Sequence, residues 1–208
     1  DTDRSRGLGD VYKRQQIYKL FRFILVDKII RARYVEYIGN QAKRACLKKD
    51  GTIMRVLAVG CHPDDLEIAC SGTLRKYVEQ GADVYMCHVA NGDQGHVIIE
   101  PGPLGKIREK EAENAGKFIG AKEVFNINVS DMQVNRHDQA QIDAVADVVR
   151  YARPDVIITH NDVDYMQDHV ETSHLATNGA FMSGLPHRSV NYPVSYTHLR
   201  AHETDQYL

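Results

Sequence analysis

A short polar run, His62-Pro63-Asp64-Asp65, follows the apolar stretch at residues 56–59. It puts one imidazole and two carboxylates into four positions, on a turn that the proline ring stiffens. Adjacent carboxylates repel each other, and the pKa of one of them rises unless a cation compensates. Because consecutive side chains on a turn diverge, one carboxylate can bind a metal while its neighbour faces a water on that metal. The run therefore predicts a metal site in which a ligand and a base lie side by side.

A second polar run, HNDVDYMQDH, covers residues 160–169 and ends in Asp168-His169. It precedes VETSHLATNGAF, for which the spacing predicts a helix. The run supplies a second imidazole from a distant part of the chain. Two histidines and one carboxylate around an open position form a known ligand set of catalytic zinc, Zn²⁺. Water bound to such a zinc becomes ionisable near neutral pH, so the two runs together predict hydrolytic chemistry.

Alternating strands and helices are predicted to position these runs. Four β-branched segments read as strands, and the segments after the first three have helical spacing. The strands are IMRVLAVG, ADVYMCHVA, KEVFNINV and PDVIITH, and the helices are LEIACSGTLRKYVEQG, GKIREKEAENAGKFIG and QAQIDAVADVVRYA. This order predicts an α/β fold, a Rossmann-like, mostly parallel sheet with helices on both faces. Ligands bind beyond the carboxyl ends of such strands, which is where both polar runs fall.

The two ends of the chain differ from its middle. Residues 1–15 and 194–208 resemble translated sequencing-adapter tails and are set aside. Residues 16–53 mix apolar and basic positions at helical spacing, which indicates a helical N-terminal extension or, alternatively, upstream sequence translated ahead of a start at Met54. Residues 54–193 are expected to form one domain that is truncated at its C-terminal end.

Composition narrows the class of protein and its partners. The 208 residues are 43% hydrophobic and 26% charged, which is typical of a globular domain, and the net charge of −2 offers no positive field for nucleic acid. The four cysteines include no C-x-x-C pair and are expected to be reduced, in a cytoplasmic protein. No run approaches the roughly 18 apolar residues of a transmembrane helix. A homo-oligomer is left open.

Four motifs carry a resemblance to a known family. CHPDDLEIACSGTL, ANGDQG, IREKEAENAGKFIG and PDVIITHNDVDYMQDH occur in the order and spacing of the LmbE/PIG-L (GlcNAc-PI de-N-acetylase) superfamily. The resemblance covers residues 54 to 180 of the domain expected at 54–193. It implies a zinc-dependent N-deacetylase, an amide hydrolase whose substrate is an N-acetylated amino sugar or its conjugate.

The resemblance also implies roles for individual residues. His62, Asp65 and His169 match the zinc ligands of the family, and Asp64 matches its general base. In this mechanism Asp64 takes the proton of the attacking water.

Three further positions are less directly tied to the metal. Arg108 and Asp131 match residues that contact the substrate sugar, and Asp168 is expected to support the ligands without binding the ion.

One position departs from the family pattern. The family commonly reads H-P-D-H where this chain has Met166-Gln167-Asp168-His169, and the first histidine of that motif helps to stabilise the oxyanion. A methionine cannot donate a hydrogen bond, so the function is absent or supplied from elsewhere. His160, His96 and His174 are candidates that the sequence does not rank.

Two other classes of function remain as alternatives. A magnesium-dependent phosphoryl-transfer domain would also place paired aspartates after a strand, although magnesium prefers shells made only of oxygen. A catalytically impaired sugar-binding homologue is the other alternative, and Met166 is the residue that suggests it.

Overall fold

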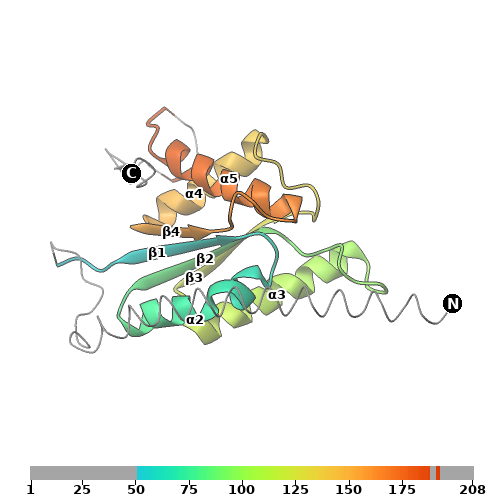
Figure 1. The fold of residues 1–208 in the computed structure, drawn as a ribbon, viewed down its shortest axis with the longest axis horizontal. Coiled ribbons are helices and arrows are strands. Elements are labelled where there is room, and N and C mark those ends of the chain that lie inside the picture. The colour runs from blue at the N-terminus through green and yellow to red at the C-terminus, as the bar shows by residue number, and fades with distance from the viewer. Residues whose placement is uncertain (1–50, 188–190, 193–208) are drawn as a thin grey trace. The chain divides into compact units, whose positions relative to one another are not determined.

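A computed structural model describes residues 51–187 and 191–192. Strands and helices alternate from one end of this part to the other (Figure 1). The tails expected at 1–15 and 194–208 lie outside the described residues, and so does the helical extension expected at 16–53 apart from residues 51–53, which are not helical. The elements are β1 (Arg55–Gly60), α2 (Asp65–Glu79), β2 (Asp83–Ala90), α3 (Pro101–Ile119), β3 (Glu123–Val129), α4 (Gln139–Ala152), β4 (Val156–Thr159) and α5 (Gln167–Ser183).

The four strands form one parallel sheet in the order β3-β2-β1-β4. In this register Val56 of β1 pairs with Val84 of β2 on one side and with Val156 of β4 on the other. The predicted α/β fold with a parallel sheet is therefore confirmed for the described residues. The chain runs outward from β1 to β2 and β3, then returns past β1 to β4. This reversal makes the boundary between β1 and β4 the switch point, where ligands bind in such sheets.

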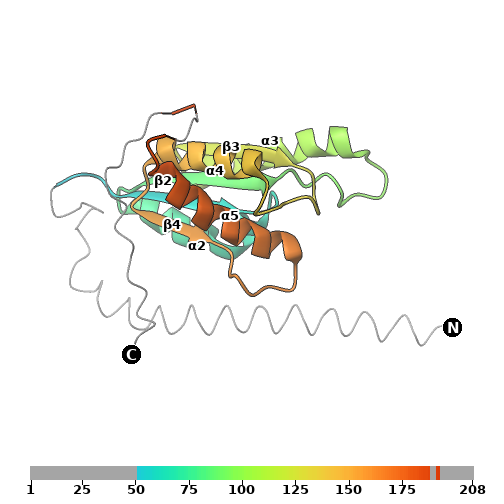
Figure 2. The same ribbon diagram turned by 90° about the horizontal axis from the view of Figure 1, so that it is seen from above.

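Alternate residues of β1 face two separate apolar cores. Leu57 and Val59 pack with buried residues of α4 and α5, whereas Val56 and Ala58 pack with those of α2 and α3. Two helices thus cover each face of the sheet, with α2 and α3 on one side and α4 and α5 on the other (Figures 1 and 2). None of the described helices is long and apolar enough to cross a membrane.

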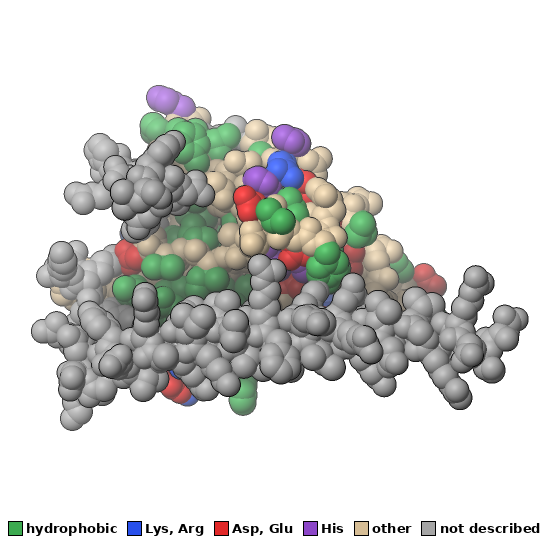
Figure 3. All heavy atoms as spheres, viewed as in Figure 1, with side chains coloured by type: hydrophobic (Ala, Val, Ile, Leu, Met, Phe, Trp, Pro, Cys, Tyr) green, Lys and Arg blue, Asp and Glu red, His purple; other side chains and the backbone are tan. Residues whose placement is uncertain are grey.

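The outer strands are less buried than the central pair. All four residues of β4 are only partly buried, while five of the six residues of β1 are buried. Figure 3 shows hydrophobic side chains at the surface on the side of the sheet where β4 lies. The most buried strands are therefore β1 and β2, and the polar run His62–Asp65 follows the end of β1.

Two glycines allow helices to approach closely. A Cβ atom at Gly60 would lie 2.6 Å from Cγ of Leu66, so glycine is required where β1 ends against the first turn of α2. A Cβ atom at Gly179 of α5 would lie 2.6 Å from Cγ1 of Val145 in α4. These contacts fix the two helices whose first turns carry the site.

Two helices begin earlier than the sequence indicates. The described α5 starts at Gln167, before the predicted VETSHLATNGAF, so Asp168 and His169 belong to its first turn. The described α3 starts at Pro101, before the predicted GKIREKEAENAGKFIG. Proline is tolerated at the first helical position because that N–H has no partner inside the helix, and the Pro-Gly-Pro segment therefore extends the helix.

Candidate metal and catalytic site

The loop between β1 and α2 folds Asp65 back onto His62. The backbone N–H groups of Asp64 and Asp65 both donate to the carbonyl of His62, at 2.9 and 3.2 Å, which makes the turn tight. Oδ2 of Asp65 then accepts a hydrogen bond from the backbone N–H of His62 at 2.7 Å. The turn that Pro63 stiffens thus holds the imidazole and the carboxylate on the same side of the loop.

The first turn of α5 brings His169 to the same carboxylate. Oδ2 of Asp65 lies 3.3 Å from Nδ1 of His62 and 3.3 Å from Nε2 of His169. One ligand atom from each of the three residues lies within 4.8 Å of the others. The structure therefore brings together the three residues that the sequence predicts as metal ligands, from loops after two neighbouring strands.

Asp168 lies behind His62. Its Oδ2 is 3.3 Å from Nε2 of His62 and accepts a hydrogen bond from the backbone N–H of Met132 at 2.6 Å. The side chain is 2% exposed, so the carboxylate is held away from water. It reaches the ring nitrogen of His62 that points away from Asp65.

The carboxylates of this buried cluster raise the pKa values of the histidines beside them. Burial alone would lower the pKa of His62, but Asp65 and the neighbouring Cys61 raise it to about 11. Burial would also raise the pKa of Asp65, yet contacts with His160, His169 and His62 hold it far below its usual range. The pKa of His169 is raised in the same way by Asp65 and Asp164, against the effect of burial.

Asp64 and Arg108 form an ion pair at the edge of this cluster. Nη2 of Arg108 donates to Oδ2 of Asp64 at 2.8 Å and also to the carbonyl of Pro63. The same guanidinium contacts Glu111 at 3.3 Å. The side chain of Asp64 is 49% exposed and faces solvent. The side chains of His62, Asp65, Asp168 and His169 are at most 17% exposed. The residue predicted as a base and one predicted to contact the sugar are thus direct partners.

Asp131 joins the loop after β3 to the loop after β2. Its Oδ1 accepts the backbone N–H of Gly92 at 2.8 Å, and its Oδ2 accepts that of Gln94 at 3.1 Å. Oδ1 also lies 3.9 Å from Nε2 of His62. Asp131, which is predicted to contact the sugar, therefore lies beside the cluster. It also holds the NGDQG loop in place, which the sequence analysis did not predict.

Of the three histidines considered as substitutes for the family residue at Met166, only His160 has described contacts at the cluster. Its Nε2 accepts the backbone N–H of Cys61 at 2.9 Å and lies 3.5 Å from Oδ2 of Asp65. Its ring stacks on that of His169, with centroids 4.2 Å apart. His96, by contrast, accepts the backbone N–H groups of Ile98 and Ile99 within an exposed turn.

Two further residues were missed by the sequence analysis, Glu171 of α5 and Arg136 of the loop between β3 and α4. Glu171 accepts three hydrogen bonds from Arg136, at 2.8 to 2.9 Å, and one from Gln167 at 2.6 Å. The Arg136 guanidinium holds the pKa of Glu171 at about 2. These bonds between Arg136 and the carboxylate of Glu171, here called the fork, join the loop that carries Asp131 to the helix that carries His169. The only signal for this contact in the sequence is that Arg136 and Glu171 carry opposite charges.

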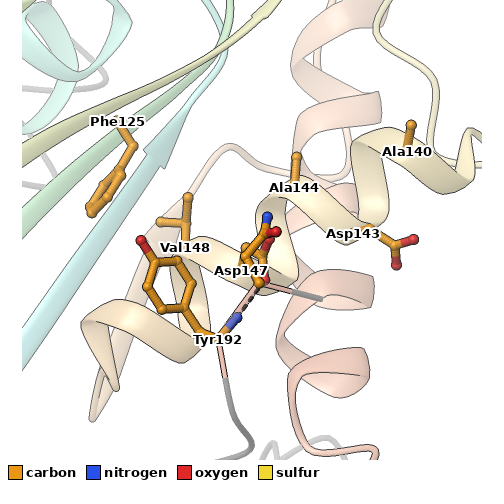
Figure 4. A pocket seen from close by; sticks show the side chains of 8 residues that line it. Phe125, Ala140, Asp143, Ala144, Asp147, Val148 and Tyr192 are labelled. Atoms are coloured by element: carbon orange, nitrogen blue, oxygen red, sulfur yellow. Dashed lines mark hydrogen bonds between the residues drawn. The ribbon is translucent and has the colours of Figure 1, made fainter. Parts of the chain in front are cut away.

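A separate hollow of about 570 Å³ lies between α4 and the described residues 191–192 (Figure 4). Nδ2 of Asn191 donates to Asp147 at 2.6 Å across one side of it. The hollow shares no residue with the histidine and aspartate cluster and is lined by no histidine or cysteine. The hollow therefore lies apart from the cluster at the strand ends.

These features define an α/β protein with a histidine and aspartate site at the carboxyl ends of its central strands. The model of the PIG-L family, GlcNAc-PI de-N-acetylase, matches residues 57–180. The chain therefore belongs to the PIG-L family, which confirms the resemblance carried by the four motifs.

Two curated relatives are similar to this chain. An Escherichia coli (strain K12) protein, uncharacterized deacetylase YaiS, is 29% identical over 121 residues, which cover 55% of this chain and 62% of the relative. The 1D-myo-inositol 2-acetamido-2-deoxy-alpha-D-glucopyranoside deacetylase of Thermobifida fusca (strain YX) is 29% identical over 155 residues, 61% of this chain and 54% of the relative. The chain thus spans less than two thirds of the length of either relative.

Two solved structures share the fold. N,N'-diacetylchitobiose deacetylase from Pyrococcus horikoshii matches with a TM-score of 0.61 at 24% identity, over 78% of this chain and 60% of that chain. GalB, a 4-carboxy-2-hydroxymuconate hydratase, matches with a TM-score of 0.61 at 22% identity, over 68% and 62%. At these identities the likeness concerns the fold alone, and the two names belong to different chemistries.

Proposed function

We propose that this protein is a zinc-dependent hydrolase that removes an N-acetyl group from an amino sugar or its conjugate. The observation that carries the proposal is the meeting of His62, Asp65 and His169 at the end of β1. The family match and the deacetylase names of the two curated relatives support the class of reaction.

The residues of the cluster fit a zinc ion. Two imidazoles and one carboxylate are a common ligand set of catalytic zinc. Both ring nitrogens of the buried His169 lack an aligned hydrogen-bond partner within the described part of the chain, which is costly for a buried imidazole. Ligation of a metal by Nε2 would satisfy one of them. Magnesium prefers oxygen ligands, so this donor set favours zinc over the phosphoryl-transfer alternative.

Asp64 is the residue that we assign to proton transfer. A bound zinc supplies a Lewis acid for the amide carbonyl and favours ionisation of water. Arg108 holds Oδ2 of Asp64, which leaves Oδ1 to take the proton of the attacking water. Asp64 then returns this proton to the amide nitrogen as the C–N bond breaks, and acetate and a free amine are the products.

The sugar is proposed to lie between Arg108 and Asp131. Each oxygen of Asp131 accepts one backbone N–H and keeps a second lone pair for a hydroxyl group. The guanidinium of Arg108 has five N–H donors. Its bonds to Asp64, Pro63 and Glu111 occupy only some of them, so others can donate to a ligand. A polar ligand with several hydroxyls, such as a GlcNAc conjugate, suits this rim.

A sugar-binding protein with impaired catalysis is the second candidate, and Met166 favours it. The family histidine at this position is replaced by a thioether, which cannot donate a hydrogen bond. His160 lies at the cluster, but its Nε2 already accepts the N–H of Cys61. Measured turnover separates the two candidates.

The test uses the purified full chain and two measurements. Zinc content is determined by elemental analysis, and release of free amine is followed with N-acetylglucosamine and a GlcNAc-inositol conjugate. We expect one zinc per chain, amine release that a chelator abolishes, and recovery when zinc is added back. Amine release that persists without metal would contradict the zinc assignment. Bound zinc without amine release would favour the impaired binding protein instead.

A further inference from the structure

Each histidine of the proposed zinc set faces two carboxylates, one at each ring nitrogen. Nδ1 of His62 lies 3.3 Å from Asp65, and its Nε2 lies 3.3 Å from Asp168. His169 repeats the pattern with its nitrogens exchanged, because its Nε2 lies 3.3 Å from Asp65 and its Nδ1 lies 3.3 Å from Oδ1 of Asp164. Asp65 is thus shared at the centre, and each imidazole has a second carboxylate behind it.

We infer that Asp164 is a positioning residue that fixes the ring of His169 for zinc binding. This inference rests on the proposed function. A carboxylate behind a metal-binding imidazole holds the proton on the remote nitrogen and leaves the lone pair of the other nitrogen for the metal. For His169 this puts the proton on Nδ1, toward Asp164, and directs the lone pair of Nε2 toward Asp65 and the ion.

The position of Asp164 is itself fixed by the backbone. Its Oδ1 accepts the N–H of Met166 at 3.0 Å, a side-chain turn that comes directly before α5. His169 follows in the first turn of that helix, so the carboxylate and the imidazole are held on one short segment. The contact of Oδ1 with Nδ1 of His169 is an ion-pair distance without hydrogen-bond alignment, and a small rotation of the ring would align it.

The face of the same ring is held by another element. His160 stacks on His169 at an interplanar angle of 14°, which fixes the ring plane but does not distinguish two orientations related by a 180° turn about the Cβ–Cγ bond. A partner at the ring edge is needed to select which nitrogen points at Asp65. Among the groups with described contacts to Nδ1 of His169, Asp164 is the carboxylate that supplies it.

The test compares three variants of the full chain. Asp164→Ala removes the carboxylate, Asp164→Asn keeps an oxygen that can accept from both Nδ1–H and the N–H of Met166, and Asp162→Ala is a control at an exposed aspartate of the same loop. Zinc affinity is measured by competition with a chromophoric chelator, and the absorption of cobalt-substituted protein reports the ligand geometry. We expect Asp164→Ala to weaken zinc binding about 10- to 100-fold and to alter the cobalt spectrum. Asp164→Asn should recover most of that loss, and Asp162→Ala should match the wild type.

Equal zinc affinity of Asp164→Ala and Asp162→Ala would overturn the inference. If Asp164→Ala does not fold, nitrogen NMR of the wild-type zinc protein decides, because a proton on Nε2 of His169 would overturn it as well. If the wild type binds zinc and releases amine while Asp164→Ala keeps the wild-type zinc affinity, this inference alone is contradicted. A wild type that binds no zinc would instead refute the proposed function.

Discussion

Arg108 lies 2.8 Å from Asp64 and joins α3 to the loop before α2, 44 positions away in the sequence. The guanidinium also reaches the carbonyl of Pro63, so it holds both the side chain and the backbone of this loop. The pair therefore links α3 to the proposed proton transfer.

Replacement of Arg108 should affect turnover more than metal binding. In Arg108→Gln the carboxylate of Asp64 loses its charged partner and its fixed orientation, and a misplaced catalytic group costs on the order of 10²-fold in rate. We expect that loss in kcat with an unchanged zinc content. Lys110→Gln, on the exposed face of the same helix, is the matched control and should keep full activity. A loss confined to KM would assign Arg108 to sugar binding alone.

Asp64 and His169 should separate catalysis from metal binding. Asp64→Asn removes a proton acceptor outside the ligand set, so we expect retained zinc and a kcat lower by about 10²- to 10⁴-fold. His169→Ala removes a proposed zinc ligand, and zinc content should fall along with activity. Both variants are checked by elemental analysis and amine release. Full activity of Asp64→Asn would refute the assignment of Asp64 as the base.

Glu171 should contribute measurably to stability. It accepts four hydrogen bonds, three of them from Arg136, and is 8% exposed. Hydrogen bonds to charged groups are worth roughly 1.5–3 kcal/mol, so Glu171→Gln should lower the free energy of unfolding by about 2 kcal/mol. Glu79→Gln breaks an exposed pair with Arg75 and should cost under about 1 kcal/mol. Urea denaturation measures both, and equal effects would show that the fork is not stabilising.

Two glycines in helices should respond to alanine in opposite directions. Gly179→Ala places a Cβ atom 2.6 Å from Val145 between α5 and α4, and overpacking of this kind costs about 1–3 kcal/mol. At Gly72 in α2 an added Cβ meets nothing within 4 Å, so Gly72→Ala should raise stability by about 0.4–1 kcal/mol. Thermal unfolding of the two variants measures the sign. A stabilised Gly179→Ala would mean that the helices separate at little cost.

Strand order made the meeting of the ligands predictable. Periodicity indicates where each strand ends, and in a parallel sheet the carboxyl ends of all strands lie at one edge. Polar runs that follow the first and fourth strands therefore had to approach each other if those strands were neighbours. The structure pairs β1 with β4, and His62, Asp65 and His169 accordingly lie together.

Contacts between loops and helix flanks were beyond the sequence. The partner of Asp64 depends on how α3 lies against the loop after β1, and helical periodicity fixes only which face of α3 is apolar. The bonds of Asp131 to Gly92 and Gln94 depend on the paths of two loops. Asp164 was equally hidden, because a polar run of ten residues does not reveal which of its carboxylates turns toward His169.

The order of the strands also determines when the site can form. His62 and Asp168 are 106 positions apart, and the strand that leads to the second half of the site is the short, half-buried β4. A ribosome releases the HPDD loop long before β4, so the proposed zinc-binding set stays incomplete until β4 docks beside β1. An ion that joins the two loops would stabilise the pairing of this outer strand with β1. Its uptake during refolding would report that β4 has paired.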